Sequence, residues 1–421
     1  MKINQSIKDL KLSATLAINE KSNQLIQEGK RVYKLGLGQS PFPVPQEVVE
    51  SLQDNAHQKD YLPVKGLYEL RKEVSNYYQR NYQLNFSPEN ILISPGSKEL
   101  LFLVQLVFDG DLLLPSPSWV SYSPQATIAG KNCHWLPTYF EDQYLLSAKT
   151  LEEYCIKNPE SSKIIILNYP NNPTGTSYDE VQLKEIARVA SKHEIIIISD
   201  EIYGEVRFDG EHQSLAKYYP EGTIISSGLS KWCGAGGWRL GTFLFPESLS
   251  WLINAMASVA SETYTSTSAP IQYAAIAAFK SSPHLKTYLN NSRAVLSKIA
   301  NYLYSEFNSL HLTIPKPVGG FYILPDFSYY RKPLKAHGIN NDEELCRILL
   351  EDTGIAILPG SVFGFDSSRL LTRLSYVDFN GEESFKFLSG DEDDNAFVKM
   401  AAPNIFEATQ KLKQWISNLS S

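Results

Sequence analysis

A lysine and an arginine lie eight residues apart in a glycine-rich segment, SSGLSKWCGAGGWRLG, at 226–241. Lys231 follows an apolar run and is surrounded by small residues. Partial burial beside other cations lowers the pKa of a lysine, and the neutral amine can then form an imine with an aldehyde. Arg239 offers a planar, permanent charge that suits a phosphate. Taken alone, a surface lysine in a glycine-rich loop explains the segment equally well, and the glycines lack the spacing of a dinucleotide-binding loop.

Polar residues follow two other apolar runs. SDEIYGE comes directly after IIII, and it carries Asp200 and, three residues later, Tyr203. A buried carboxylate needs a partner, and a protonated pyridine nitrogen is a suitable one, although an aspartate that caps the next helix is the ordinary alternative. In NYPNNPTG, Asn172 precedes a proline, which favours extended backbone and turns the side chain out of the sheet. An ordinary turn would explain the same residues.

Three further segments carry residues that suit a flat, anionic ligand. In SPGSKELL, the amides of Gly96, Ser97 and Lys98 would form a helix N-terminus, which binds anions. Trp119 in PSPSWVSY could stack on a ring, although most tryptophans are simply packed. Arg373 interrupts an apolar strand in RLSY, so it needs an anion, and a substrate carboxylate would satisfy it with two hydrogen bonds.

The elements that must position these residues alternate between short apolar runs and helical patterns. This alternation is typical of a parallel sheet covered by helices, which binds ligands beyond the carboxyl ends of its strands. We expect strands at 91–94, 112–115, 163–169, 195–201, 224–227 and 241–245. We expect a helix at 181–193, with a capping box formed by Ser177 and Glu180.

The pattern from about residue 285 onward predicts a smaller α+β region. We expect a long helix at 289–307, followed by strand-like pieces at 319–327, 355–360 and 370–377. The acidic segment 389–397 is expected to be a solvated loop, because blocks of charge usually lie outside the core.

Composition excludes several classes of protein. The chain has 421 residues, of which 43% are apolar and 20% charged, so it is neither disordered nor fibrous and is long enough for two or three domains. The net charge of −7 argues against nucleic-acid binding through a general positive field. The four cysteines and seven histidines show no metal-binding spacing, so we expect no metal site. No signal peptide or apolar span is visible, and we therefore expect a cytoplasmic protein.

Taken in order, the segments resemble the class I and II aminotransferases of fold type I, of the aspartate and aromatic type, which use pyridoxal 5′-phosphate. The resemblance runs from about residue 30 to the C-terminus. The segments that carry it are LGLGQSPFPVP, YLPVKGLYELR, SPGSKELL, PSPSWVSY, NYPNNPTG, SDEIYGE, SKWCGAGGWRLG, GGFYILPDF, ILPGSVFG and RLSY. It implies an α/β fold with a mostly parallel seven-stranded sheet and a smaller α+β domain. We expect an N-terminal arm at 1–45 that belongs to the small domain, a large cofactor-binding domain at 46–285 and a small C-terminal domain at 286–421.

The resemblance also implies roles around the cofactor ring. Lys231 would hold the cofactor covalently and act as the base, and Asp200 would pair with the pyridine nitrogen. Tyr203 and Asn172 would hydrogen-bond the phenolic oxygen of the ring, and Trp119 would stack on the ring.

Other roles concern the phosphate and the substrate. Arg373 and the backbone near Gly38 would bind the substrate α-carboxylate, next to Trp119 and Asn172. The residues implied at the phosphate are Gly96, Ser97, Lys98 and Arg239, together with Tyr61 of a neighbouring subunit. The resemblance therefore implies a homodimer with shared active sites.

The expected activity is transfer of an amino group from an L-amino acid to a 2-oxo acid, with no nucleic-acid or membrane partner. Lys98 lies where some acid-preferring relatives carry a lysine, so aspartate or another acidic donor is a hypothesis. The alternative of a non-catalytic regulator is disfavoured, because it would need a DNA-binding module and the motifs already begin near residue 35. The same residues also support β-elimination, as in a cysteine–sulfur lyase, because the bond that breaks is the one held perpendicular to the ring.

Two departures from the family pattern concern the phosphate and the acidic donor. Gly228 stands where many relatives carry a phosphate-binding serine, and Ser227 or Ser230 would have to replace it. No arginine occurs between Arg239 and Arg293, where one aspartate-specific subgroup has the residue that binds the side-chain carboxylate.

Overall fold

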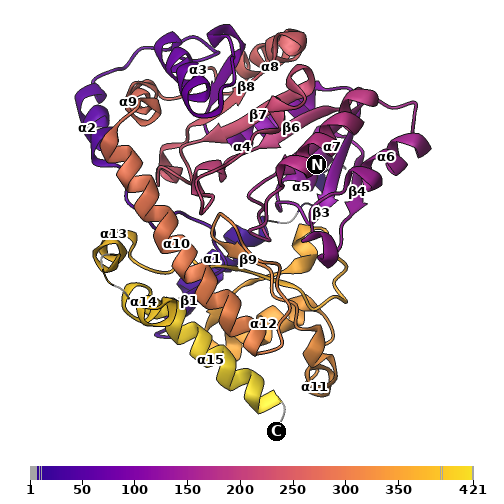
Figure 1. The fold of residues 1–421 in the computed structure, drawn as a ribbon, viewed down its shortest axis with the longest axis vertical. Helices are drawn as coiled ribbons and strands as arrows, with labels where there is room; N and C mark the ends of the chain where they lie inside the picture. Colours follow the sequence, from indigo (N-terminus) through magenta and orange to yellow (C-terminus); the bar gives the residue numbers. More distant parts are fainter. Residues whose placement is uncertain (1–6, 9, 11, 389, 391, 420–421) are drawn as a thin grey trace.

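A seven-stranded sheet forms the centre of the larger part of the molecule (Figure 1). The computed structural model describes residues 7–8, 10, 12–388, 390 and 392–419. The strand order is β2-β8-β7-β6-β5-β3-β4, and only β8 runs antiparallel to its neighbours. The strands are β2 (Ile91–Ser94), β3 (Asp111–Ser116), β4 (Cys133–Pro137), β5 (Lys163–Asn168), β6 (Ile196–Asp200), β7 (Thr223–Gly228) and β8 (Gly241–Leu244). The mostly parallel α/β sheet is confirmed.

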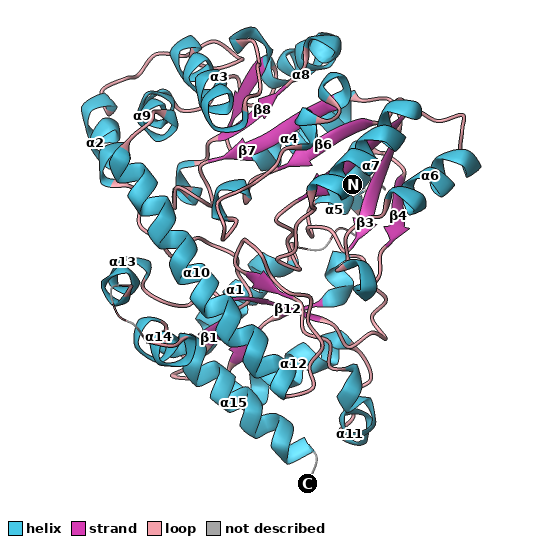
Figure 2. Ribbon diagram, in the orientation of Figure 1, coloured by secondary structure: helices cyan, strands magenta, loops and turns pink. Residues whose placement is uncertain are grey.

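Apart from the edge strand β4, the strands of this sheet are largely buried on both faces, since helices cover both sides and successive side chains point to opposite sides. In β3, Leu112 and Leu114 pack in one apolar cluster with α4, α5 and α8, whereas Leu113 packs in another with α6 and α7. Figure 2 shows the helices on both sides of the sheet. The helices of this part are α2 (Gln46–Asn55), α3 (Tyr68–Tyr82), α4 (Ser97–Val107), α5 (Tyr122–Ala129), α6 (Ala148–Lys157), α7 (Glu180–Lys192), α8 (Ser250–Ser261) and α9 (Ala269–Phe279).

The start of α7 corrects one sequence prediction. The capping box is formed by Asp179 and Gln182, not by Ser177 and Glu180. The Asp179 carboxylate accepts a hydrogen bond from the Gln182 amide at 2.8 Å, and the Gln182 side chain accepts one from the Asp179 amide at 3.0 Å. Aspartate is at least as good an N-cap as serine, and the N-cap of α7 therefore lies at Asp179, two residues after the predicted N-cap Ser177.

The smaller part combines the C-terminal third of the chain with its N-terminal segment. β1 (Tyr33–Lys34) pairs with β10 (Ile355–Ala356), and β9 (Tyr322–Ile323), β11 (Leu358–Pro359) and β12 (Thr372–Ser375) form an antiparallel sheet. The strands are shorter than the predicted pieces. The helices are α1 (Ala14–Gln27), α10 (Pro283–Ser309), α11 (Arg331–Ala336), α12 (Asp342–Thr353), α13 (Gly381–Ser384), α14 (Asp394–Ala401) and α15 (Pro403–Leu419). The long α10 runs along both parts of the molecule (Figure 1).

The acidic segment 389–397 is not wholly a loop. Ser389 and Asp391 lie outside the described residues, but Asp393 caps α14 by accepting a hydrogen bond from the Ala396 amide at 2.8 Å. Phe397 is fully buried, because it lies on the face of α14 that packs against α10. Among the described residues, no helix combines the length and the apolar character needed to cross a membrane.

Candidate active site

A cavity opens at the carboxyl ends of the parallel strands. It measures about 620 Å³ including its open mouth. Of the sequence-predicted site residues, it is lined by Ser97, Lys98, Trp119, Asn172, Asp200, Tyr203, Lys231 and Arg239. The side chains of Tyr122, Asn168, Ile202 and Ser230 complete the lining. The structure therefore brings together residues that lie more than 140 positions apart in the sequence.

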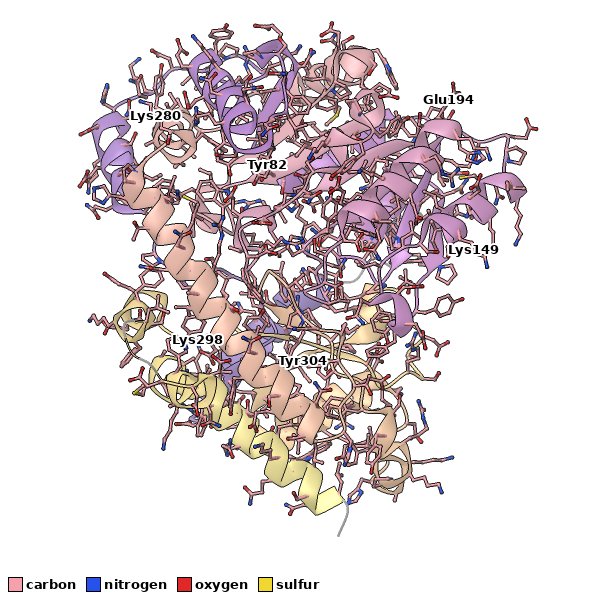
Figure 3. All side chains as sticks on the ribbon, viewed as in Figure 1. Tyr82, Lys149, Glu194, Lys280, Lys298 and Tyr304 are labelled. Atoms are coloured by element: carbon pink, nitrogen blue, oxygen red, sulfur yellow. The ribbon has the colours of Figure 1, made fainter. Side chains whose placement is uncertain are left out.

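Lys231 follows β7 and points its amine across the cavity. Its Nζ atom donates a hydrogen bond to the backbone oxygen of Gly38 at 2.6 Å. Burial, and then the positive charge of Arg373, lower the pKa of Lys231 to about 8, against the opposing effect of Asp200. By contrast, Lys149 lies on the outer rim of the molecule (Figure 3), with 85% of its side chain exposed. Lys231 is thus a part-buried amine that is partly neutral near physiological pH.

Asp200 ends β6 with a buried carboxylate. It accepts hydrogen bonds from the Tyr122 hydroxyl at 2.5 Å and from Ser226 Oγ at 3.3 Å, and a longer one from the Ile202 amide at 3.4 Å. Burial raises the pKa of Asp200 to about 6, and the hydrogen bonds limit the rise. A carboxylate in this state favours a cationic partner in the cavity.

Asn172 and Tyr203 lie beside this carboxylate. The Asn172 amide donates to Asn168 Oδ1 at 2.8 Å, which fixes the turn after β5. The Asn172 side-chain oxygen accepts a hydrogen bond from Arg373 Nη1 at 3.4 Å. The side-chain nitrogen Nδ2 of Asn172 makes no hydrogen bond to another described residue, so its two N–H groups remain for a ligand. The Tyr203 hydroxyl lies 2.9 Å from that of Tyr322.

The opposite end of the cavity is suited to an anion. Gly96 caps α4 with φ of +94°, and a side chain there would overlap the guanidinium of Arg239. Arg239 donates to the backbone oxygens of Gly236 and Pro95 at 3.0 and 3.1 Å. Lys98 is exposed overall, but packing around its amine and the charge of Arg239 lower its pKa. A helix N-terminus with two cationic side chains is a typical phosphate site.

The departure at Gly228 has a structural reason. A side chain at this position would meet the backbone oxygen of Leu240 at 2.5 Å, so a serine there would require a backbone shift. Ser230 lines the cavity, whereas Ser227 is buried and does not. Ser230 is therefore the better candidate to replace the missing serine.

Arg373 is fully buried without a carboxylate partner among the described residues. Its Nη2 atom donates to the Gly36 backbone oxygen, and Nε has no hydrogen-bond partner. The rings of Tyr322 and Phe363 lie 4.8 and 5.3 Å from the guanidinium carbon. Burial lowers the pKa of Arg373, yet a guanidinium stays charged in proteins. An anionic ligand would supply the missing counter-charge.

Tyr61 stands apart from the cavity in this chain. It is 90% exposed and is not among the lining residues. Sequence reasoning also missed Tyr122, Asn168 and Tyr322, although each lies inside a segment that was singled out: PSPSWVSY, NYPNNPTG and GGFYILPDF.

The residues present fit pyridoxal phosphate. Asp200 faces the cavity as a buried carboxylate that suits a pyridinium nitrogen, and Lys231 supplies an amine for the aldehyde. Because Gly96 has no side chain, the Arg239 guanidinium lies directly against the N-terminus of α4, and the two together suit the phosphate. The residues of the cavity thus match the ring nitrogen, the aldehyde and the phosphate of this cofactor.

Comparison with known proteins identifies relatives over most of the chain. The family model described as aminotransferase class I and II matches residues 30–380. The aspartate aminotransferase of Bacillus sp. (strain YM-2) is 32% identical over 381 residues, which cover 88% of this chain and 93% of that enzyme. A probable aspartate/prephenate aminotransferase of Aquifex aeolicus is also 32% identical, over 88% of this chain and 93% of its own.

Solved structures show the same similarity. The aspartate aminotransferase from Thermus thermophilus with maleate superposes with a TM-score of 0.85 at 27% identity. The match covers 98% of this chain and 99% of the Thermus chain.

The buried charge of Asp200 predicts a pH-dependent stability of the cofactor-free protein. Because the folded pKa is raised from 3.8 to about 6, the stabilising contribution of the protonated form is present below pH 4 and is lost as the pH rises through 6. At pH 8 we expect Asp200→Asn to raise the free energy of unfolding by on the order of 2–3 kcal/mol, and to do so much less at pH 4.

Denaturant unfolding of the cofactor-free protein at both pH values measures this effect. Asp209→Asn is the control, because Asp209 is half exposed and its pKa is lowered, despite partial burial, by hydrogen bonding to Arg207. Equal stability of the Asp200→Asn variant and the unaltered protein at pH 8 would contradict the assignment of an uncompensated buried charge.

Proposed function

The chain belongs to the class I and II aminotransferases, which use pyridoxal 5′-phosphate, and we propose that its amino donor is aspartate or another acidic L-amino acid and its acceptor a 2-oxo acid. The names of the Bacillus, Aquifex and Thermus relatives support this substrate class, and they favour amino-group transfer over β-elimination. The observation that carries the proposal is the amine of Lys231, which donates to the Gly38 backbone oxygen at 2.6 Å in a cavity that Asp200 also lines, and whose pKa is lowered to about 8 by burial and then by the charge of Arg373.

Lys231 has two tasks in this proposal. When bound, pyridoxal phosphate supplies an aldehyde for the lysine and a ring that takes up the electrons of the broken Cα–H bond. The substrate amine would displace Lys231, and the freed Lys231 amine would then remove the Cα proton as a general base and deliver it to the carbon that had carried the aldehyde oxygen. An amine with a pKa near 8 is partly neutral at working pH, so it can accept that proton.

The other residues orient the ring and fix its charge. The Asp200 carboxylate keeps the ring nitrogen protonated, and Tyr122 holds that carboxylate in place through the hydrogen bond of 2.5 Å. Tyr203 and Asn172 line the cavity and would donate to the phenolic oxygen, and Trp119 would cover the face of the ring. The phosphate would be bound by the α4 N-terminus at Gly96, Ser97 and Lys98, by Arg239 and by Ser230.

Arg373 binds the substrate α-carboxylate. Among the described residues, the guanidinium donates hydrogen bonds only to the oxygens of Gly36 and Asn172. A carboxylate would form two parallel, charge-assisted hydrogen bonds and would offset the cost of burying the charge. Gly38, whose oxygen accepts from Lys231, lies on the same segment and borders the same subsite.

We also propose that the active unit is a homodimer and that Tyr61 completes the site of the partner. At 90%, Tyr61 is the most exposed large apolar side chain among the described residues, and aromatic side chains are enriched at interfaces. The division into an arm at 1–45, a large domain at 46–285 and a small domain at 286–421 belongs to the same proposal. It is supported by the pairing of β1 with β10 across the chain.

Replacement of Lys231 tests the central role. Lys231→Ala should lower the rate of amino transfer from aspartate by about a thousandfold or more, because both the covalent attachment and the base are lost. The unaltered holoenzyme mixed with aspartate should lose its yellow absorbance as the pyridoxamine form accumulates. The control is Lys149→Ala, which removes an exposed lysine. Near-native transfer by Lys231→Ala would refute the role.

Replacement of Lys98 tests the substrate class. Its amine lies at the phosphate end of the cavity, 5.3 Å from the centre of the Trp119 ring. If it binds the side-chain carboxylate, Lys98→Ala should lower kcat/KM for aspartate roughly tenfold relative to alanine as donor. The ratio of the two kcat/KM values is the measurement, since a loss of phosphate binding would lower both equally. An unchanged ratio would remove Lys98 from substrate recognition.

Mixed dimers test the shared site. Lys231→Ala and Tyr61→Ala each damage every site of their own homodimer. Subunits mixed in equal amounts should place one intact site, with Lys231 from one chain and Tyr61 from the other, in about half of the dimers. The mixture should therefore regain activity and cofactor affinity that neither variant has alone. Activity equal to the average of the two variants would show that Tyr61 acts within its own chain or not at all.

A further inference from the structure

Tyr322 is buried among three groups of the site but does not line the cavity itself. Its hydroxyl lies 2.9 Å from the hydroxyl of Tyr203. The guanidinium carbon of Arg373 lies 4.8 Å from the centre of its ring. A side chain at Gly38 would overlap the same hydroxyl, so the segment whose backbone oxygen binds Lys231 runs directly past it. Tyr322 thus connects the carboxylate-binding, lysine-binding and ring-binding residues.

The two hydroxyl groups must order their protons. A tyrosine hydroxyl has one proton to donate, and its oxygen can accept hydrogen bonds. If Tyr203 donates to the phenolic oxygen of the cofactor, its proton is no longer free for Tyr322. The contact at 2.9 Å is then a hydrogen bond from Tyr322 to the Tyr203 oxygen. Accepting a hydrogen bond strengthens the one that a hydroxyl donates.

The surrounding charge favours this direction. Burial raises the pKa of Tyr322, and the charge of Arg373 is the largest effect that opposes the rise. Burial also raises the pKa of Tyr203, but the charge of Arg373 opposes that rise only weakly compared with the other effects. The hydroxyl on which the cation acts more strongly is the better donor, and that hydroxyl belongs to Tyr322.

We propose that Tyr322 is a positioning residue that donates its proton to the Tyr203 oxygen and thereby directs the single Tyr203 proton to the phenolic oxygen of the cofactor. The proposal rests on the proposed function, since it needs a cofactor phenolic oxygen beside Tyr203. It gives the GGFYILPDF segment a role in the chemistry through its tyrosine.

Tyr322→Phe removes the hydroxyl and keeps the ring against Arg373. In the holoenzyme, a weaker hydrogen bond from Tyr203 stabilises the negative phenolic oxygen less. The pH midpoint of the absorbance change of the lysine-bound cofactor should therefore rise by about half a unit. We expect kcat with aspartate to fall about three- to tenfold, and KM to stay within about twofold because the Arg373 subsite is unchanged.

Tyr376→Phe is the matched control. Tyr376 is also fully buried, and its hydroxyl donates to the backbone oxygen of Gly320 at 3.3 Å. Its loss should lower stability without moving the pH midpoint or kcat. A general effect of removing a buried hydroxyl would move both variants alike.

Binding to the cofactor-free protein gives a readout that does not depend on activity. Tyr322→Phe should weaken the binding of pyridoxal phosphate about threefold. It should leave unchanged the binding of an analogue that lacks the phenolic oxygen, because Tyr203 then has nothing to donate to. A purely structural role would weaken both ligands equally.

The outcomes distinguish a failure of the proposed function from a failure of the Tyr322 role alone. If the unaltered protein binds no pyridoxal phosphate and transfers no amino group, the proposed function fails, and this inference fails with it. If the unaltered protein and Tyr376→Phe behave normally while Tyr322→Phe keeps the native pH midpoint, the role of Tyr322 alone is overturned. An equal loss of affinity for pyridoxal phosphate and for the analogue would also overturn the role of Tyr322, and the proposed function would stand.

Discussion

The active site depends on buried charges that the protein leaves without full compensation. Asp200, Lys231 and Arg373 all lie in or beside one cavity, yet none of them forms an ion pair with another described residue. Burial of such groups is unfavourable, as the raised pKa of Asp200 and the lowered pKa of Lys231 show. The large apolar clusters on both faces of the sheet must therefore supply the stability, and we propose that the ring nitrogen of the cofactor and the carboxylate of the substrate supply the missing partners.

The register of three neighbouring strands holds these charges in place. Asn168 at the end of β5 pairs with Asp200 at the end of β6, which pairs in turn with Ser226 near the end of β7. The turns that carry Asn172, Tyr203 and Lys231 therefore leave the sheet at almost the same level. A shift of one strand by a single residue would turn Asp200 to the opposite face of the sheet and break the arrangement.

The sequence allowed prediction of the parts of the site that follow from local pattern. Six strands of the large sheet and the polar residues at their ends were predicted because buried parallel strands are continuous apolar runs. β4 was missed, since CHWLP is an edge strand in which only Leu136 is buried. Tyr122 and Tyr322 were missed as well, because their importance lies in contacts with Asp200 and Tyr203 across 78 and 119 positions. No periodicity reports such contacts.

The position of Arg373 links substrate binding to the strength of the base. Its positive charge is the largest electrostatic contribution that lowers the pKa of Lys231. A substrate carboxylate bound to Arg373 would neutralise that charge, and the proton affinity of the nearby amine would rise. The amine would thus be partly neutral, and able to react with an aldehyde, while the carboxylate subsite is free, and it would become a stronger base once a substrate is bound. The guanidinium that we propose recognises the amino acid would therefore also prepare Lys231 to accept its proton.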